Sequence, residues 1–204
     1  MEDNMIKNSI PLVNWVKIFC TALKVFVVFA VFLGILYPLF ITAIGIIFMN
    51  NKANGSLIYK DNVVRGSTLI AQDFKSEKYF HPRYSAVDYK GNGSGGSNMA
   101  PSDILFKELI VQRRAVLDNE NNIAINVNIP SDMLTSSWSG LDPHISIENA
   151  FLQLPRVAKK RNLSQNMLEQ LISKNIDNDF IGIWGQDSVN VLKLNIALDE
   201  ITGK

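Results

Sequence analysis

The chain has 204 residues, of which 47% are hydrophobic and 19% charged, and this composition excludes an intrinsically disordered protein and predicts a folded core. The 20 Lys and Arg residues nearly balance the 19 Asp and Glu residues, so there is no basic field that could hold a nucleic acid, and nucleic-acid binding is excluded. A single cysteine, Cys20, excludes a disulfide framework and a cysteine-rich zinc module. The two histidines, His81 and His144, leave little material for another metal site.

One long apolar segment near the N-terminus decides the class of protein. Residues 25–49 contain no charged side chain, and as a helix they would span about 37 Å, enough to cross the hydrocarbon core of a bilayer. A buried core helix of this length would need polar residues on one face, and a cleavable signal peptide would have a shorter apolar stretch and a small-residue cleavage site. The segment is therefore predicted to be a retained anchor that crosses the membrane once.

Within the anchor, a proline and several small residues are expected to shape its contacts. Pro38 lacks a backbone donor and is expected to kink the helix. Small side chains would let a second transmembrane helix approach closely. The positions predicted for packing in the membrane are Gly34, Pro38, Ala43 and Gly45.

The flanking charges do not decide the orientation of the anchor, because three basic residues lie near it on each side. They are Lys7, Lys17 and Lys24 before the anchor and Lys52, Lys60 and Arg65 after it. A short arm ahead of a first anchor is usually cytoplasmic. We therefore expect a cytoplasmic arm over residues 1–24, a transmembrane helix over residues 25–49 and an extracytoplasmic soluble domain over residues 50–204, in the cell membrane.

The soluble part begins with a predicted hairpin followed by a long loop. Two β-rich runs, residues 57–59 and 63–64, flank the turn-like residues 60–62. Residues 79–102 have aromatic side chains early and glycines late, with neither strand nor helix periodicity, and are expected to form a loop.

Helices are expected to follow the loop. The first would be capped by Ser102 and would run to about Leu117, with a buried face formed by Leu105, Leu109 and Val116. Ser146 and Ser164 are expected to cap two further helices, the first of which Pro155 would interrupt. The predicted buried stripes of the last two helices are Met167, Leu168, Leu171 and Ile172, and Val191, Leu194, Asn195 and Leu198. This order predicts a mixed α/β (α+β) domain anchored by one N-terminal transmembrane helix.

Missing motifs narrow the range of functions that the chain could have. The sequence has no GxxxxGK[ST] phosphate loop, no phosphorylation motif of P-type ATPases and no potassium selectivity filter. Residues 91–96 read GNGSGG, which fits the dinucleotide pattern GxGxxG, but no buried strand is predicted before them, so cofactor binding is not expected. The segment is either a flexible loop or a small anion-binding nest built on Ser94, Ser97 and Asn98.

Asp142-Pro143-His144 places a carboxylate two residues before an imidazole. In an extended segment both side chains would lie on the same side, as an acid–base pair or two metal ligands would require. The favoured interpretation is structural, with Asp142 as a turn residue before proline and His144 bonded to a backbone carbonyl. Residues 79–83 are likewise interpreted as an aromatic anchor that packs a loop onto a core, with Arg83 paired to an acid.

Six motifs follow the predicted anchor in order. They are GSTLIAQ (66–72), YFHPR with Ser85, Ala86 and Tyr89, SGGSN (94–98) with Pro101 and Ser102, SGLDPHIS (139–146), RVAKKR (156–161) and VNVLKLNIALD (189–199). Together they closely resemble the KdpC family, the accessory chain of the Kdp potassium-transporting ATPase, over nearly the whole chain. The sequence departs from the family pattern in local loop positions, which are Ala71, Tyr84, Met99, Ala100, Trp138 and residues 185–188.

The resemblance implies a non-catalytic accessory subunit rather than an enzyme. The partners it implies in the Kdp complex are a channel-like potassium-binding subunit, a catalytic P-type ATPase subunit and a small membrane subunit, together with membrane lipid. The complex would use ATP, Mg²⁺ and K⁺, whereas no cofactor is expected on this chain itself. The family has been described as a catalytic chaperone that raises the ATP affinity of the catalytic subunit, and its topology places the domain outside, over the potassium entrance.

Three loop segments are expected to contact the channel-like subunit, because their polar, Gly- and Pro-rich sequences are more distinctive than an ordinary loop requires. The predicted interface residues are Tyr79, Phe80, His81, Pro82, Arg83, Ser94, Gly95, Gly96, Ser97, Asn98, Ser139, Gly140, Asp142 and His144. One alternative is a single-pass membrane-anchored hydrolase in which Ser139 or another serine works with His144 and Asp142. A sensor ectodomain is the other, although about 24 residues ahead of the anchor are too few for a folded effector.

Overall fold

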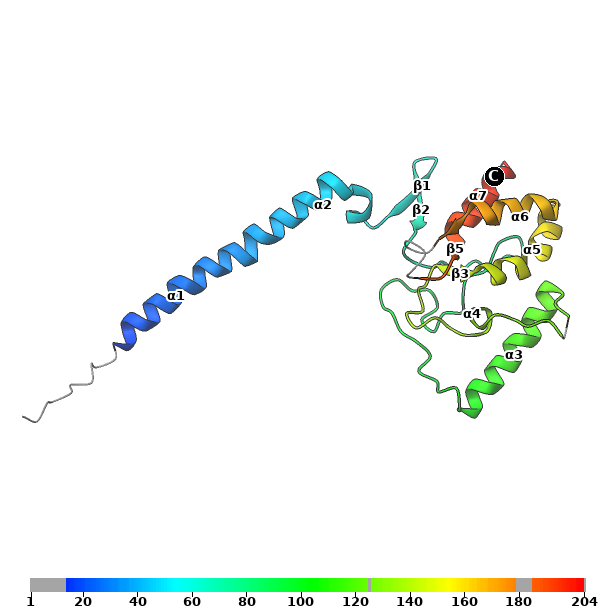
Figure 1. Cartoon of the computed structure of the whole chain (residues 1–204), viewed down its shortest axis with the longest axis horizontal. Coiled ribbons are helices and arrows are strands. Elements are labelled where there is room, and N and C mark those ends of the chain that lie inside the picture. Colours follow the sequence, from blue (N-terminus) through cyan, green and yellow to red (C-terminus); the bar gives the residue numbers. More distant parts are fainter. Residues whose placement is uncertain (1–13, 125, 179–184, 204) are drawn as a thin grey trace, which may run out of the picture. The chain divides into compact units, whose positions relative to one another are not determined.

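The computed structural model describes residues 14–124, 126–178 and 185–203. The chain divides into two compact units, one up to Asn54 and the other from Gly55 onward. The elements, labelled in Figure 1, are α1 (Trp15–Val31), the π-helical turn η1 (Phe32–Leu36) and α2 (Tyr37–Ala53) in the first unit, and β1 (Leu57–Lys60), β2 (Val63–Ser67), α3 (Ile104–Asn121), α4 (Ser131–Leu134), β3 (His144–Ser146), α5 (Ile147–Arg161), α6 (Gln165–Lys174), β4 (Ile176–Asp177), β5 (Ser188–Asn190) and α7 (Val191–Ile201) in the second.

In the first unit, α1, η1 and α2 follow one another without a loop from Trp15 to Ala53, with a kink at Met49, and in the described part of the chain this stretch alone is long and apolar enough to cross a membrane. Asn14 caps its start, where the side chain accepts a hydrogen bond from the Lys17 backbone N–H at 3.1 Å. No residue in its most apolar window is buried. An apolar helix without a protein face to pack against fits a membrane anchor rather than a core helix.

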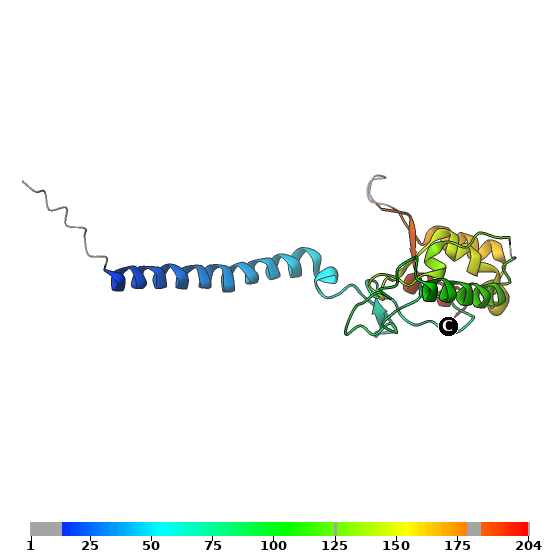
Figure 2. The ribbon, with the colours of Figure 1, turned by 90° about the horizontal axis from the view of Figure 1, so that it is seen from below.

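The kink expected at Pro38 is replaced by a π-helical turn. The turn η1 directly precedes the proline, and the Tyr37 N–H reaches back five residues to the Phe32 carbonyl. Pro38 then falls in the first turn of α2, where the wider preceding turn makes room for its ring. Figure 2 shows the helix continuing through this point, and the non-helical residue inside α2 is instead Met49, near the C-terminal end.

The predicted hairpin is confirmed as β1 and β2, an antiparallel pair in which Leu57 faces Ser67. Asp61 and Asn62 form the two-residue turn with φ values of 54° and 60°, a left-handed conformation that Asp and Asn tolerate better than most residues. At the other end of β2, Gly66 has a φ of 155°, and a Cβ there would lie only 2.0 Å from the Gln72 side chain.

The helix after the long loop is present as α3, but its start and its buried face differ from the prediction. Asp103 is the cap, because its Oδ1 accepts a hydrogen bond from the Leu105 N–H at 3.0 Å. Leu105 and Val116 are 63% and 49% exposed, so the predicted apolar face is wrong. The C-terminal half of α3 contacts the domain, through the buried Leu117, which lies beside Ile129 and Met133, and through Arg113, which donates to the Leu134 carbonyl at 2.8 Å.

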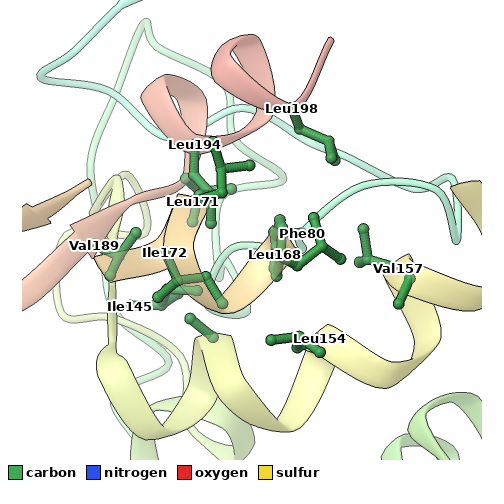
Figure 3. Close-up of a cluster of buried hydrophobic side chains, with 13 residues drawn as sticks. Phe80, Ile145, Leu154, Val157, Leu168, Leu171, Ile172, Val189, Leu194 and Leu198 are labelled. Atoms are coloured by element: carbon green, nitrogen blue, oxygen red, sulfur yellow. The ribbon is translucent and has the colours of Figure 1, made fainter. Parts of the chain in front are cut away.

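The main core lies between α5, α6, α7 and a three-stranded antiparallel sheet in the order β3-β5-β4. Figure 3 shows its side chains converging from these elements, with Phe80 entering from the loop before α3. The predicted caps are confirmed, since Ser146 and Ser164 accept hydrogen bonds from the backbone at Asn149 and Met167. The predicted stripes are largely buried as expected, apart from Met167, which is 47% exposed. The buried members are Leu168, Leu171, Ile172, Val191, Leu194, Asn195 and Leu198.

Pro155 does not interrupt its helix, contrary to the prediction. Helix α5 runs through it from Ile147 to Arg161 and presents Leu154 and Val157 to the core on either side. Pro155 itself is exposed. Water can therefore satisfy the carbonyl one turn earlier that loses its partner, and core packing outweighs the local cost of the proline.

Candidate functional site

The segment around Phe80 is held in the core by side chains instead of by a neighbouring strand. The Phe80 side chain is fully buried, although residues 79–83 belong to no strand. The Asn195 amide on α7 accepts a hydrogen bond from the Phe80 N–H and donates one to the Phe80 carbonyl, both at 2.9 Å. Asn195 is 1% exposed, so water does not compete for these bonds.

Two residues of α5 extend this arrangement along the same segment. The Gln153 amide accepts from the His81 N–H at 2.7 Å and donates to the His81 carbonyl at 3.0 Å. Arg156 donates to the carbonyls of Glu77 and Tyr79 at 2.6 and 3.0 Å and to the Gln153 side-chain oxygen at 2.7 Å. A buried guanidinium is costly unless its donors are used, and here they are used on backbone carbonyls. We call residues 77–83 the clamped segment.

The rings of Tyr79 and His81 in the clamped segment are also held in place by contacts. The Tyr79 hydroxyl donates to Asp199 at 3.1 Å, and the Arg161 guanidinium lies 4.5 Å from the centre of the Tyr79 ring. The His81 Nε2 lies 3.1 Å from the Ser76 carbonyl. Burial lowers the pKa of His81 below its ordinary value, and the nearby Arg156 charge adds to this, so the neutral ring is favoured.

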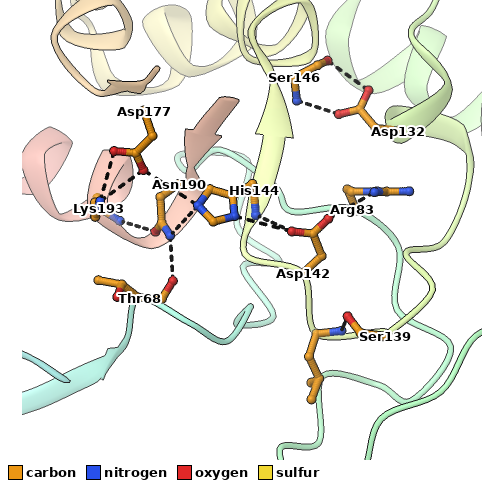
Figure 4. A network of polar contacts seen from close by, with 11 residues as sticks. Thr68, Arg83, Asp132, Ser139, Asp142, His144, Ser146, Asp177, Asn190 and Lys193 are labelled. Atoms are coloured by element: carbon orange, nitrogen blue, oxygen red, sulfur yellow. Dashed lines mark hydrogen bonds and ion pairs between the residues drawn. The ribbon is translucent and has the colours of Figure 1, made fainter. Parts of the chain in front are cut away.

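Arg83 and His144 meet at Asp142, as Figure 4 shows. Arg83 donates to the Asp142 carboxylate at 3.1 Å, which confirms the predicted pairing of Arg83 with an acid. Asp142 also accepts from the His144 backbone N–H at 3.0 Å, the turn geometry expected before a proline. Burial acts to raise the pKa of Asp142, but the hydrogen bonds from His144 and the Arg83 charge outweigh it, and the pKa is lowered.

The His144 ring links two parts of the domain. Its Nδ1 is 3.6 Å from Asp142, and its Nε2 is 3.8 Å from Asp177 on β4 and 3.4 Å from the Asn190 amide. The backbone carbonyl predicted as its partner is replaced by these side chains. Asn190 in turn donates to the Thr68 carbonyl at 2.8 Å, which connects the β hairpin to β5.

These contacts do not place Ser139 beside His144, as the hydrolase interpretation with Ser139 as nucleophile would require. The Ser139 Oγ accepts a hydrogen bond from the Leu141 N–H at 3.1 Å, and Figure 4 shows it on the far side of Asp142 from the His144 ring. Across residues 14–124, 126–178 and 185–203, no three His, Cys, Asp or Glu side chains are grouped so as to hold a metal ion. The hydrogen bonds at Asp142 and His144 fix the loop that carries them.

Three loops form a second arrangement, which we call the loop cluster (residues 83–89, 93–99 and 136–143). The Ser85 hydroxyl donates to the Gly140 carbonyl at 2.6 Å, and the Gly95 N–H donates to the Ser139 carbonyl at 2.9 Å. Gly140 has a φ of 68°, and a Cβ there would lie 2.8 Å from the Gly95 carbonyl oxygen. The backbones therefore approach too closely for any other residue at Gly140.

Comparison with known proteins is consistent across the chain. The family model described as "KdpC: K+-transporting ATPase, c chain" matches residues 19–200. The chain belongs to this family. Among its relatives, the "Potassium-transporting ATPase KdpC subunit" of Mycobacterium bovis (strain BCG / Pasteur 1173P2) is 43% identical over 182 residues, which is 88% of this chain and 96% of the relative. The proteins of the same name from Caldanaerobacter subterraneus and Bacillus cereus are 42% and 40% identical, over 87% and 85% of this chain and 92% and 90% of their own lengths.

Within this KdpC-family chain, the residues predicted to contact a partner fall into three groups by exposure. Phe80 and Gly140 are buried, so their side-chain positions serve the interior. The half-buried group is Tyr79, His81, Pro82, Arg83, Gly95, Gly96, Asp142 and His144. The exposed group is Ser94, Ser97, Asn98 and Ser139. Of these groups, the exposed one offers surface to a partner without rearrangement of the domain.

Two features of the KdpC-family fold bear on residues that sequence reasoning left out or left open. Trp138 is 92% exposed in the loop cluster, although sequence reasoning treated it only as a departure from the family pattern. In the anchor, a Cβ added at Gly34 would meet no atom within 4 Å, so this position has room for a neighbouring helix. Packing at Gly34, Pro38, Ala43 and Gly45 stays a prediction.

Proposed function

We propose that this chain is a non-catalytic accessory subunit of an ATP-driven potassium uptake complex, needed for its assembly and activity. The match of a potassium-transporting ATPase family over residues 19–200 is the observation that carries the proposal. The relatives are named as KdpC subunits of a potassium-transporting ATPase, and they align over nearly their whole length. In the complex, a catalytic P-type subunit would hydrolyse ATP with Mg²⁺, and a channel-like potassium-binding subunit and a small membrane subunit would complete the membrane part.

The proposed topology has a cytoplasmic arm, one membrane crossing and an extracytoplasmic domain. Within residues 14–124, 126–178 and 185–203, Trp15 to Ala53 is the one candidate membrane helix, and it supports one crossing. A domain on the outer side could cap the potassium entrance of the channel-like subunit, but it could not touch ATP on the cytoplasmic side. An effect of this chain on ATP affinity would therefore run through coupled conformations of the complex.

The loop cluster is the proposed contact with the channel-like subunit. Its backbone is fixed by hydrogen bonds between loops, including Ser137 N–H to the Tyr84 carbonyl at 3.2 Å, so it would lose little entropy on binding. Ser94, Ser97 and Asn98 are exposed along one of its loops. Such a prearranged polar rim suits protein recognition better than it suits a catalytic site.

The first experiment is to extract the tagged chain in mild detergent from its native membrane and identify the co-purifying proteins by mass spectrometry. A P-type ATPase and a channel-like potassium subunit in fixed stoichiometry are expected. Recovery of the chain alone, under conditions that preserve other membrane complexes, would contradict the proposed function.

The loop assignment has its own test with charged substitutions at exposed positions. Ser94→Arg and Ser97→Arg place bulky charges on the loop cluster, whereas Gln112→Arg places the same charge on the exposed surface of α3. We expect the first two to lower recovery of the channel-like subunit about tenfold, as loss of one to two kcal/mol at an interface would, and the third to leave it unchanged. Equal recovery from all three variants would remove the loop cluster from the interface.

A further inference from the structure

An apolar patch on the loop cluster has no part in the contacts described so far. Trp138 is 92% exposed, more than any other large hydrophobic residue described, and Leu69 and Ile70 are 60% and 37% exposed. These three residues line one shallow hollow of about 500 Å³ together with Leu141 and Pro143. Water therefore faces an indole and two aliphatic side chains that share one surface.

The patch is rigid, although it lies on loops. The Ala71 N–H donates to the Leu141 carbonyl at 2.9 Å, which ties the segment of Leu69 and Ile70 to the loop that carries Trp138. Behind the indole, a Cβ at Gly96 would come within 3.2 Å of the Trp138 carbonyl oxygen, so the two backbones are in contact. A surface that is already ordered gives up little conformational entropy when it binds.

The covalent path from the anchor to the patch is short. Three residues separate the last residue of α2, Ala53, from Leu57, which pairs with Ser67, and Leu69 follows two residues after Ser67. At full extension this path is at most about 26 Å, from about 3.6 Å per residue and about 5 Å between paired strands. Because this short link tethers the patch to the anchor, the patch meets the lipid surface at a high effective concentration.

The charge and residue types along that path suit a lipid surface. Between residues 52 and 65 the chain carries three basic residues and one acidic residue, Asp61. The exposed Tyr59 on β1 adds a second amphipathic ring. Tryptophan and tyrosine prefer the headgroup level of a bilayer, and basic residues are attracted to anionic lipids.

We propose that Trp138, Leu69 and Ile70 form a lipid-docking patch that rests on the interface of the bilayer that the anchor spans. The indole would lie at the level of the headgroups, with the two aliphatic side chains against the upper acyl chains. Docking would restrict the orientation of the domain at the membrane surface. The proposal is independent of the function proposed above, because it needs only the anchor and lipid.

The test uses the full chain in vesicles of equal amounts of phosphatidylcholine and phosphatidylglycerol. Trp15→Phe and Trp184→Phe leave Trp138 as the single tryptophan. With phosphatidylcholine brominated near the top of its acyl chains, we expect blue-shifted Trp138 emission that is quenched about twofold relative to plain lipid. Leu69→Asp with Ile70→Asp should abolish the quenching, and Val111→Asp, on the exposed surface of α3, should preserve it.

Three results would overturn the proposal. One is Trp138 emission at the wavelength of water-exposed indole, equal in plain and brominated vesicles. Another is quenching that survives Leu69→Asp with Ile70→Asp while circular dichroism shows an unchanged fold. The third is a blue shift without lipid quenching that appears only after a channel-like subunit is co-reconstituted, because it would assign the patch to a protein partner.

Discussion

The clamped segment and the loop cluster both have distinctive sequence motifs, but the physical reasons for these motifs differ. In the clamped segment, the particular residues are those that satisfy buried backbone groups, as Asn195 does for Phe80 and Gln153 for His81. In the loop cluster, they are residues that allow close backbone approach, such as Gly140 against Gly95. A distinctive motif can therefore mark internal construction as easily as it marks recognition.

The difference assigns separate tasks to the two regions. Phe80 is fully buried and reaches no surface, so the clamped segment joins α5 and α7 to the start of the long loop. The loop cluster keeps Ser94, Ser97 and Ser139 exposed on a fixed backbone. Substitutions of buried or paired residues in either region should therefore act on stability, whereas substitutions of the exposed serines of the loop cluster should act on binding.

The largest expected effect is that of Asn195→Ala. It leaves the N–H and the carbonyl of Phe80 buried without partners, and we expect the free energy of unfolding to fall by about 2–5 kcal/mol. Denaturant unfolding of the full chain in detergent, followed by circular dichroism, measures this. Asn119→Ala, on the exposed surface of α3, is the matched control and should change it by less than about 0.5 kcal/mol. Equal effects of the two variants would refute the clamp.

Gly140→Ala should have the next largest effect. The φ of 68° disfavours a side chain, and the added Cβ would lie 2.7 Å from the Val87 side chain, so we expect a loss of about 1–3 kcal/mol. The matched control is Gly93→Ala, where a Cβ would meet no atom within 4 Å. If both variants unfold at the same denaturant concentration, close approach at Gly140 is unimportant.

Asp142→Asn tests the carboxylate between Arg83 and His144. Loss of the charge should cost about 1 kcal/mol at neutral pH, because Arg83 keeps its position without a counter-charge. The pKa of Asp142 is below its ordinary value of 3.8, so the native carboxylate contributes fully above that pH and loses its contribution as pH falls through the lowered pKa. The variant should therefore lose less stability than the parent in this acid window. Asp88→Asn, at an exposed carboxylate, should behave like the parent.

The smallest expected effect is a pH dependence at His81. Its pKa is below the ordinary value of 6.5, so the folded state binds protons less readily than the unfolded state, and stability should fall as pH drops below 6.5. His81→Gln should reduce the difference in the free energy of unfolding between a pH above 6.5 and a pH below it, by a few tenths of a kcal/mol to about 1 kcal/mol. Denaturant unfolding of the parent and the variant at both pH values measures this. A parent and variant with parallel pH profiles would show that His81 does not titrate differently on folding.

Features that depend mainly on residues close together in the sequence were predicted correctly. The turn at Asp61 and Asn62 and the caps Ser146 and Ser164 follow from short-range preferences, and all three are present. Leu105 is exposed although helical spacing placed it on the core face, because tertiary contacts engage the C-terminal half of α3 and leave Leu105 outside them. Pro155 was misjudged for a related reason, since its exposure is set by how α5 lies on the core.

The candidate site was less accessible to sequence reasoning, because its contacts join distant residues. The salt bridge between Arg83 and Asp142 was anticipated as a pairing with some acid, but the partner lies 59 residues away. The amide of Asn195 appeared only as one position of a helical stripe. Trp138 interrupted a family motif, and nothing in its neighbours along the chain indicates that Leu69 lies beside it.

The hydrogen bonds between Asn195 and Phe80 also constrain the order in which the domain can fold during synthesis. They join positions 115 residues apart, and Asn195 lies on α7, far after Phe80 in the sequence. During synthesis, the clamped segment emerges before α7 and lacks the Asn195 partner until α7 has been made. Phe80 is therefore unprotected until α7 has been synthesised, and formation of the clamp then closes a loop between positions 115 residues apart. A chain that stops short of α7 would lack the clamp and expose the part of the domain made long before it.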